Sequence, residues 1–225
     1  MSLTPAQQKK IRNLYESHTL EVSDLVKIAL ARSKSDATFL QALRAEYAWP
    51  DDELEAGDHV IPWGRWCEVA CRYIHGGPAA LGKLGTDAKT CLDYFDYCVS
   101  FLSSIQTKES VAAVCQIAEA TPPQCAKQIE RPTLQLAEAF NLLLCIKGAP
   151  KISKATEKRV RDYLHRQFDQ ELETVERASV FDALRGVGDK TSLELLEQAE
   201  DLPEPFEDER MDAVKAIKKR IAAKK

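Results

Sequence analysis

Apolar residues recur three or four positions apart along most of this chain, with polar residues between them. Such spacing predicts amphipathic helices, because one face of an α-helix repeats about every 3.6 residues. Strand patterns, in which apolar and polar residues alternate, are nearly absent. Glycine and proline interrupt the helical pattern at short intervals, for example at Pro50, Gly76–Gly77 and Pro122–Pro123. The pattern therefore predicts an all-α protein of roughly ten to twelve short helices.

The ends of several predicted helices can be placed from single residues. Thr4 followed by Pro5 is typical of a helix N-cap and first helical position. A helix beginning near Trp63 should stop at Gly76–Gly77, and "PAALGKLG" should form a short helix or turn. In the strongly apolar segment that follows, one stripe is expected to consist of Leu92, Phe95, Val99 and Leu102.

Four later helices share apolar residues at relative positions 1, 4 and 7. Their first residues are separated by 29, 41 and 30 positions, a spacing typical of stacked helical repeats. Amphipathic helices share this pattern by default, so coincidence remains an alternative. The four sets are Val111/Val114/Ile117, Phe140/Leu143/Ile146, Phe181/Leu184/Val187 and Met211/Val214/Ile217.

Residues 178–221 resemble a HEAT-like repeat of the type also found in phycobilisome-lyase-like proteins. The resemblance rests on a helix that ends in Leu184, Val187, Gly188 and Asp189, on the helix "TSLELLEQAED" and on the turn "LPEPF". A third helix with a small-residue and apolar stripe follows, and Arg210 roughly meets the arginine that the family places after the turn. The match is looser over 107–170 and is not visible before about residue 86.

This resemblance implies a HEAT-like α-solenoid of stacked antiparallel helix pairs over residues 87–225. Each helix pair in such an array covers the apolar stripe that its neighbour cannot bury alone. Residues 1–86 are then expected to form an N-terminal helical cap. Because no Gly/Ser-rich linker separates the two regions, the cap should pack continuously on the repeats.

Composition narrows the class of protein. The chain has 225 residues, 44% of them hydrophobic and 29% charged, which allows a sizeable core in a soluble protein. Its net charge of −4 does not favour nucleic acid. The first residues lack the apolar stretch of a secretory signal, and no apolar run is long enough to span a membrane. The seven cysteines lie mostly in apolar helical patterns, which predicts reduced, buried thiols and a cytoplasmic protein.

The segment 49–66 differs from the rest, because it contains five acidic residues and all three tryptophans. It does not match the calcium-binding loop of an EF-hand, which has glycine at position 6 and glutamate at position 12. Here Gly57 falls at position 7 and Pro62 at position 12. Acid–base catalysis, a solvated linker and a partner-contact loop remain as interpretations. Exposed tryptophan is a common interface anchor, so we expect a protein-binding role. The residues concerned are Asp51, Asp52, Glu53, Glu55, Asp58, Trp63 and Trp66.

Other candidate chemistry has simpler explanations. Cys67, Cys71 and His75 would share one helix face, but no second ligand cluster has zinc-finger spacing. They are better interpreted as two core thiols and an exposed histidine at a helix end. The segment "RGVGDKTS" at 185–192 lacks the spacing of a phosphate-binding loop. No catalytic residue, metal or cofactor is therefore predicted.

A basic segment precedes a strongly acidic one in the second half of the chain. It can be a solvated helix face, a binding strip for an acidic partner, or a contact for phosphate. Aromatic residues that would stack on bases are not interleaved with it, which disfavours nucleic acid. The basic residues are Lys151, Lys154, Lys158, Arg159, Arg161 and Arg166.

These features predict a non-enzymatic protein-binding helical-repeat protein that acts as a scaffold, adaptor or inhibitor. One version is a bacterial immunity-type protein that neutralises a toxin, and an acidic chain would suit a basic partner. The alternative is a DNA-binding or DNA glycosylase-type enzyme with HEAT-like repeats that uses the basic segments.

Overall fold

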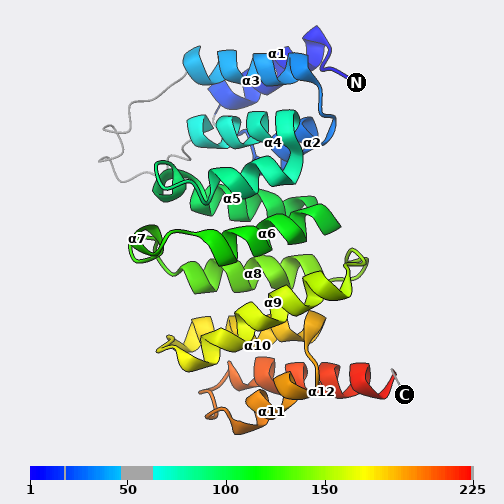
Figure 1. Cartoon of the computed structure of the whole chain (residues 1–225). Helices are drawn as coiled ribbons and strands as arrows, with labels where there is room; N and C mark the ends of the chain where they lie inside the picture. Colours follow the sequence, from blue (N-terminus) through cyan, green and yellow to red (C-terminus); the bar gives the residue numbers. More distant parts are fainter. Residues whose placement is uncertain (18, 47–62, 224–225) are drawn as a thin grey trace.

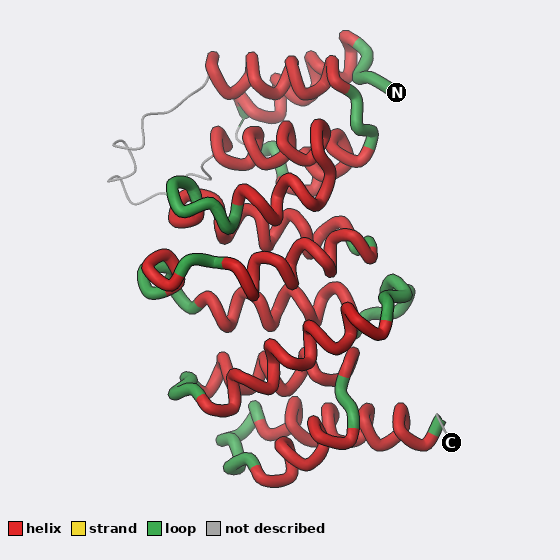
Figure 2. The backbone as a smooth tube through the Cα atoms, viewed as in Figure 1, coloured by secondary structure: helices red, strands yellow, loops and turns green. Residues whose placement is uncertain are grey.

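We describe a computed structural model of the chain, in which residues 1–17, 19–46 and 63–223 are described. This part contains twelve α-helices, one short 3-10 helix and no strand, which confirms the all-α prediction. From α4 onward, loops of a few residues connect the helices (Figure 2). None of the described helices is both long and apolar enough to cross a membrane. The helices are α1 (Pro5–Glu16), α2 (Val22–Leu30), α3 (Lys34–Glu46), α4 (Trp63–Leu84), α5 (Cys91–Ile105), α6 (Lys108–Ala120), α7 (Pro123–Ala126), α8 (Pro132–Leu144), α9 (Lys154–Arg166), η2 (Gln167–Asp169), α10 (Thr174–Val187), α11 (Lys190–Gln198) and α12 (Glu207–Ala222).

Helix ends follow the local sequence signals. Thr4 caps α1 through a capping box: its hydroxyl accepts from the backbone N–H of Gln7, and the Gln7 side chain accepts from the backbone N–H of Thr4. The predicted start at Thr4–Pro5 is therefore confirmed.

The helix α4 is broken at Gly77, as the sequence predicted. Gly77 has a φ of 64°, a conformation that glycine adopts without the cost that a side chain would add. The Arg32 guanidinium lies against this residue and stacks over the Tyr73 ring, 5.3 Å from the ring centroid. Pro78 then begins the short second part of the helix, because proline suits a first helical position.

The helices form two parallel rows that run along the molecule in chain order (Figure 1). In one row, α2, α5, α8, α10 and α12 each pack against the next, and in the other α3, α4, α6, α9 and α11 do the same. Contacts between α4 and α5, α6 and α8, α9 and α10, and α11 and α12 join the rows. The chain ends therefore lie at opposite ends of the stack.

One hydrophobic core runs through the stack, from Ile11 in α1 to Ile217 in α12. Most residues of the four 1-4-7 sets are buried in it, among them Phe140, Phe181 and Leu184. There are two exceptions. Ile146 lies past the end of α8 and is half-buried. Met211 is 43% exposed, because α12 ends its row and no described helix covers its outer side.

The stripe predicted for α5 is wrong at one position. Leu92 is 50% exposed, whereas Cys91, Phe95, Cys98 and Leu102 are buried. The buried face therefore begins one residue earlier than expected. Cys91, Phe95, Cys98 and Leu102 lie three or four residues apart and share one face of α5, which packs against α4, α6 and α8.

Cys91 and Cys125 form a disulfide between the start of α5 and α7. The prediction that all cysteines are reduced is therefore wrong for this pair. Their separation of 34 residues gave no spacing signal, because only the folded chain brings α7 back onto α5. The other cysteines, Cys67, Cys71, Cys98, Cys115 and Cys145, are free, and all but Cys145 are fully buried.

Two glycines at the end of α10 set how closely its neighbours approach. A Cβ on Gly186 would lie 2.7 Å from the Cβ of Leu144 in α8, and one on Gly188 would lie 2.4 Å from the Cδ1 of Ile217 in α12. Neither glycine has a positive φ. Their role is thus close helix packing, and it adds to the helix stop that the sequence indicated.

Arginines from neighbouring helices bind the carbonyls at the same helix end. Arg161 of α9 donates to the Val187 carbonyl at 2.9 Å, and Arg220 of α12 donates to the Gly186 carbonyl. The last carbonyls of a helix have no partner within it, so these contacts satisfy groups that would otherwise be buried and unpaired. They fix α9 and α12 against α10.

Candidate functional site

The acidic part of the tryptophan-flanked segment lies outside the described residues. This applies to Asp51, Asp52, Glu53, Glu55 and Asp58. Their role in partner binding stays a prediction.

The two tryptophans at the start of α4 lie in different surroundings. Trp66 is only 9% exposed and packs edge-on against Tyr97, with ring centroids 5.1 Å apart, and near Phe101. Trp63 is half-buried against the same core. Trp66 is therefore a core residue that joins α4 to α5, and Trp63 is the more exposed of the two.

Charged side chains surround this end of α4. Glu68 accepts hydrogen bonds from Arg44 of α3 and from Arg72, each at 2.7 Å. Arg65 lies 3.3 Å from Asp93 of α5 and over the Tyr97 ring. The described residues at the start of α4 thus combine a half-buried aromatic side chain with paired charges, a composition found at the rim of protein interfaces.

Half of the proposed basic strip is paired with carboxylates of the protein itself. Arg159 binds Glu119 of α6 through two nitrogens, and Arg161 binds Asp189 at 2.8 Å as well as the Val187 carbonyl. Lys158 pairs with Asp162 on its own helix. Lys151, Lys154 and Arg166 are exposed. Two of the six side chains, Arg159 and Arg161, therefore join α9 to other segments, and Lys158 is paired within its own helix, which weakens the strip as a phosphate-binding surface.

The free thiols are poor nucleophiles. Burial raises the pKa of Cys67, Cys71 and Cys115 to about 12, so they stay protonated at neutral pH. The Cys71 thiol donates to the Ala37 carbonyl at 3.3 Å, which ties α4 to α3. His75 is exposed. The interpretation of Cys67 and Cys71 as core thiols, with an exposed histidine one turn later, is confirmed.

A Ser–His–Asp grouping joins α9 to α11. The His165 Nε2 lies 2.7 Å from the Ser192 hydroxyl, and the Asp189 carboxylate accepts from the Ser192 backbone N–H at 3.2 Å. Ser192 is completely buried and contacts the histidine on one side and the helix cap on the other. A nucleophilic serine must reach a substrate, so this geometry indicates a structural contact. Burial lowers the pKa of His165.

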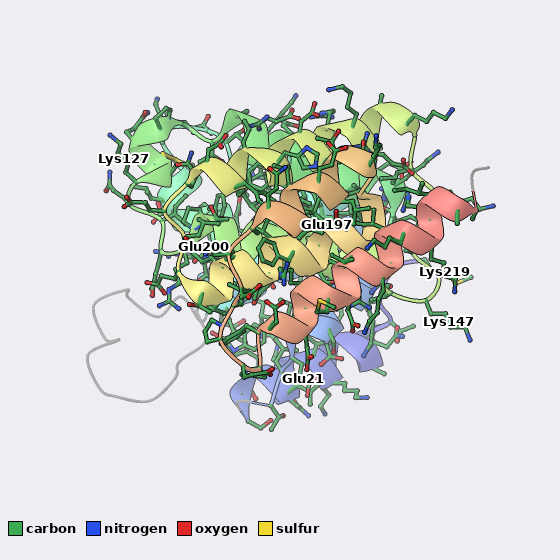
Figure 3. All side chains as sticks on the ribbon, turned by 90° about the horizontal axis from the view of Figure 1, so that it is seen from below. Glu21, Lys127, Lys147, Glu197, Glu200 and Lys219 are labelled. Carbon is green, nitrogen blue, oxygen red and sulfur yellow. A yellow bond between two sulfur atoms is a disulfide. The ribbon has the colours of Figure 1, made fainter. Side chains whose placement is uncertain are left out.

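A pocket lies where the α9–α10 connection meets the α11–α12 turn. It has a volume of about 270 Å³, near the lower end of the range for small-molecule sites. Apolar side chains form about half of its wall, and amide and charged side chains form the rest. The apolar residues are Phe168, Leu172, Val180, Phe181 and Ala199, and the polar ones are Gln167, Gln170, Arg177 and Glu200. The rings of Phe168 and Phe181 stand 5.5 Å apart. Figure 3 shows the pocket residue Glu200 on the side of the stack away from Lys147 and Lys219.

The polar side chains of this pocket differ in how closely they are bound by other groups of the protein. Gln167 is buried, and its amide donates to the Tyr163 carbonyl and accepts from the Thr133 hydroxyl. Arg177 and Glu200 form an ion pair with a long separation of 3.6 Å. Sequence reasoning missed this pocket, because its residues come from three segments whose meeting only the fold decides.

Comparison of this chain with protein-family models, with curated proteins and with solved structures found no match.

Proposed function

We propose that this chain is a non-enzymatic protein-binding helical-repeat protein with a HEAT-like solenoid architecture. The observation that carries the proposal is the pair of helix rows, α2–α5–α8–α10–α12 and α3–α4–α6–α9–α11. Stacked rows create extended surfaces to which several helices contribute, and recognition on such surfaces depends on scattered side chains. The resemblance of residues 178–221 to a HEAT-like repeat supports the same proposal.

The partner is proposed to be a protein, and a basic one in the immunity-type version. The net charge of −4 and the acidic segment 51–58 support this choice, because opposite charge speeds encounter between proteins. Trp63 provides an aromatic contact at the edge of that segment. The DNA-binding alternative draws less support, since Arg159, Arg161 and Lys158 are paired with carboxylates of this chain.

A cytoplasmic location belongs to the same proposal. The Cys91–Cys125 disulfide weakens it, because disulfides persist mainly in oxidising compartments. Fractionation of the native cells with rapid thiol trapping decides between the cytoplasm and an oxidising compartment. It reports both the compartment of the protein and the oxidation state of Cys91 and Cys125.

The binding proposal is tested by capture followed by reconstitution. Native lysate is passed over the immobilised full chain, retained proteins are identified by mass spectrometry, and the best candidate is purified for calorimetry. We expect a saturable complex that weakens as salt rises. We also expect weaker binding to this partner when each acidic residue of the segment is changed to asparagine or glutamine, namely Asp51, Asp52, Glu53, Glu55 and Asp58.

The matched control neutralises five exposed carboxylates elsewhere and should bind as the native chain does. These are Glu109, Glu138, Glu194, Glu197 and Asp212. If no purified protein forms a saturable complex, while duplex DNA gives a salt-sensitive gel shift, the DNA-binding alternative replaces this proposal.

A further inference from the structure

The pocket between η2, α10 and the α11–α12 turn holds one charge of each sign beside an apolar wall. Arg177 and Glu200 are its only charged lining residues among the described part of the chain. Their side chains are 33% and 88% exposed, so both groups are open to solvent or to a ligand. The wall behind them includes Phe168, Leu172 and Phe181.

The two charges are loosely paired. Their closest atoms are 3.6 Å apart, which is beyond ordinary hydrogen-bond length. By contrast, Arg210 binds Asp201 at 2.9 Å and the Leu196 carbonyl at 3.0 Å within the same turn region. Arg177 is thus an arginine whose planar set of donors is not held by a close acceptor, and such donors suit a carboxylate.

The charge pattern selects among ligand types. A purely anionic ligand on Arg177 would be repelled by Glu200, and a cationic ligand on Glu200 would be repelled by Arg177. A ligand that carries a carboxylate and an ammonium group on the same carbon atom satisfies both side chains at once. The apolar wall and the volume of about 270 Å³ suit one side chain of the size of leucine or phenylalanine.

We propose that this pocket binds a free α-amino acid with an apolar or aromatic side chain. The α-carboxylate lies on Arg177, the α-ammonium lies on Glu200, and the side chain enters the space between Phe168, Leu172 and Phe181. A residue within a peptide cannot supply this pattern, because it lacks at least one of the two charges. The inference is independent of the proposed protein-binding function.

Titration of the ¹⁵N-labelled full chain with L-phenylalanine, followed by NMR, tests the proposal. We expect saturable shifts of the backbone amides of Phe168, Leu172 and Ala199, with a dissociation constant on the order of 1 mM for a ligand of this size. Glycine lacks the side chain, 3-phenylpropanoate lacks the ammonium, and 2-phenylethylamine lacks the carboxylate. Each should bind at least about threefold more weakly, as expected for contacts near the surface.

Two variants, each with a matched control, test whether Arg177 and Glu200 bind the charged groups of the ligand. Arg177→Gln and Glu200→Gln should each weaken L-phenylalanine binding about threefold or more. Arg185→Gln on α10 and Glu197→Gln on α11 should leave it unchanged. Circular dichroism shows whether each variant folds, and Glu200→Gln alters an exposed turn residue, so it remains informative if Arg177→Gln does not fold.

Three results would overturn the proposal. The first is the absence of saturable shifts at these amides. The second is binding of 3-phenylpropanoate or 2-phenylethylamine as tight as that of L-phenylalanine, which would show that one charge suffices. The third is unchanged affinity for L-phenylalanine in the Glu200→Gln variant, which would show that the ligand's α-ammonium does not bind Glu200.

Discussion

Replacing Gly188 with alanine tests whether close packing at the end of α10 holds the last helices together. The added Cβ would lie 2.4 Å and 2.6 Å from the Cδ1 and Cγ1 of Ile217, and 2.7 Å from the Leu184 carbonyl oxygen. Ile217 is fully buried, and the Leu184 carbonyl already accepts from the Gly188 N–H at 2.7 Å. Neither neighbour can move without disturbing α12 or the end of α10.

The expected cost follows from these contacts. The Gly188 backbone, with φ −57° and ψ 149°, is open to alanine, so conformational strain does not contribute. Overpacking of a core by one methyl group costs about 1–3 kcal/mol, while the stiffer unfolded chain returns about 0.4–1 kcal/mol. We therefore expect the free energy of unfolding to fall by about 1–2 kcal/mol on these grounds.

Urea denaturation followed by circular dichroism at 222 nm measures this change. Gly64→Ala is the matched control, because among the described residues its Cβ would meet nothing closer than the Arg44 Cγ at 3.9 Å. It should leave stability unchanged or raise it by up to about 1 kcal/mol. A Gly188→Ala protein as stable as the native chain, or a Gly64→Ala protein equally destabilised, would refute the reasoning.

A double-mutant cycle tests whether the loss of stability in Gly188→Ala arises from the contact between the end of α10 and Ile217 of α12. Ile217→Ala removes both carbon atoms that the new Cβ would strike, and alone it should cost about 2–5 kcal/mol. In the Gly188→Ala background the same change should cost at least about 1 kcal/mol less, because it relieves the clash. Additive effects would mean that the Leu184 carbonyl, and not α12, limits the space.

Three further outcomes are expected. Reduction of the Cys91–Cys125 disulfide should lower stability by about 2–4 kcal/mol, since it closes a separation of 34 residues, and dithiothreitol should not affect a chain with both cysteines changed to alanine. Stability should fall as pH falls from about 6.5 toward the lower folded-state pKa of His165, because the unfolded histidine binds the proton more readily. Iodoacetamide at neutral pH should label the native Cys67, Cys98 and Cys115 far more slowly than the unfolded chain, because burial raises the pKa of all three.

Each of these outcomes has its own check. Melting curves with and without reductant test the disulfide, and an equal response of native and double-alanine chains would contradict it. A His165→Gln variant should lose less stability on acidification than the native chain. Equal dependence of stability on pH in the two proteins would exclude His165 as the cause. The polar groups around His165 are Ser192, Asp189, Arg161, Asp162 and Lys158. Mass spectrometry counts the labels on the thiols, and rapid native labelling would show that they are not protected.

The sequence predicted what depends on local periodicity and capping. Thr4 and Pro5 start α1, and Gly77 breaks α4, because these preferences act through the backbone of a few adjacent residues. The apolar stripes located most of the core, including Phe140 and Phe181. The predicted stripes were wrong at Met211 and Leu92, which are exposed, and at Ile146, which lies past the end of α8 and is half-buried. Periodicity marks a helix face, but it does not say whether another helix covers that face.

The pocket could not be predicted in the same way. Phe168, Arg177 and Glu200 come from three segments and become neighbours only when the helices stack. The same holds for the contact between His165 and Ser192, although Asp189 and Ser192 carried a readable capping signal three residues apart.

By itself, then, the sequence determined that the chain is helical, where some helices begin or break, as at Thr4 and Gly77, and most of the apolar faces, since each depends on interactions within a few turns. Only the tertiary structure decided that Trp66 belongs to the core, that Arg159 and Arg161 are occupied, and that Cys91 meets Cys125. Those outcomes depend on which distant helix lies opposite each side chain. The spacing of residues along one helix contains no information about that choice.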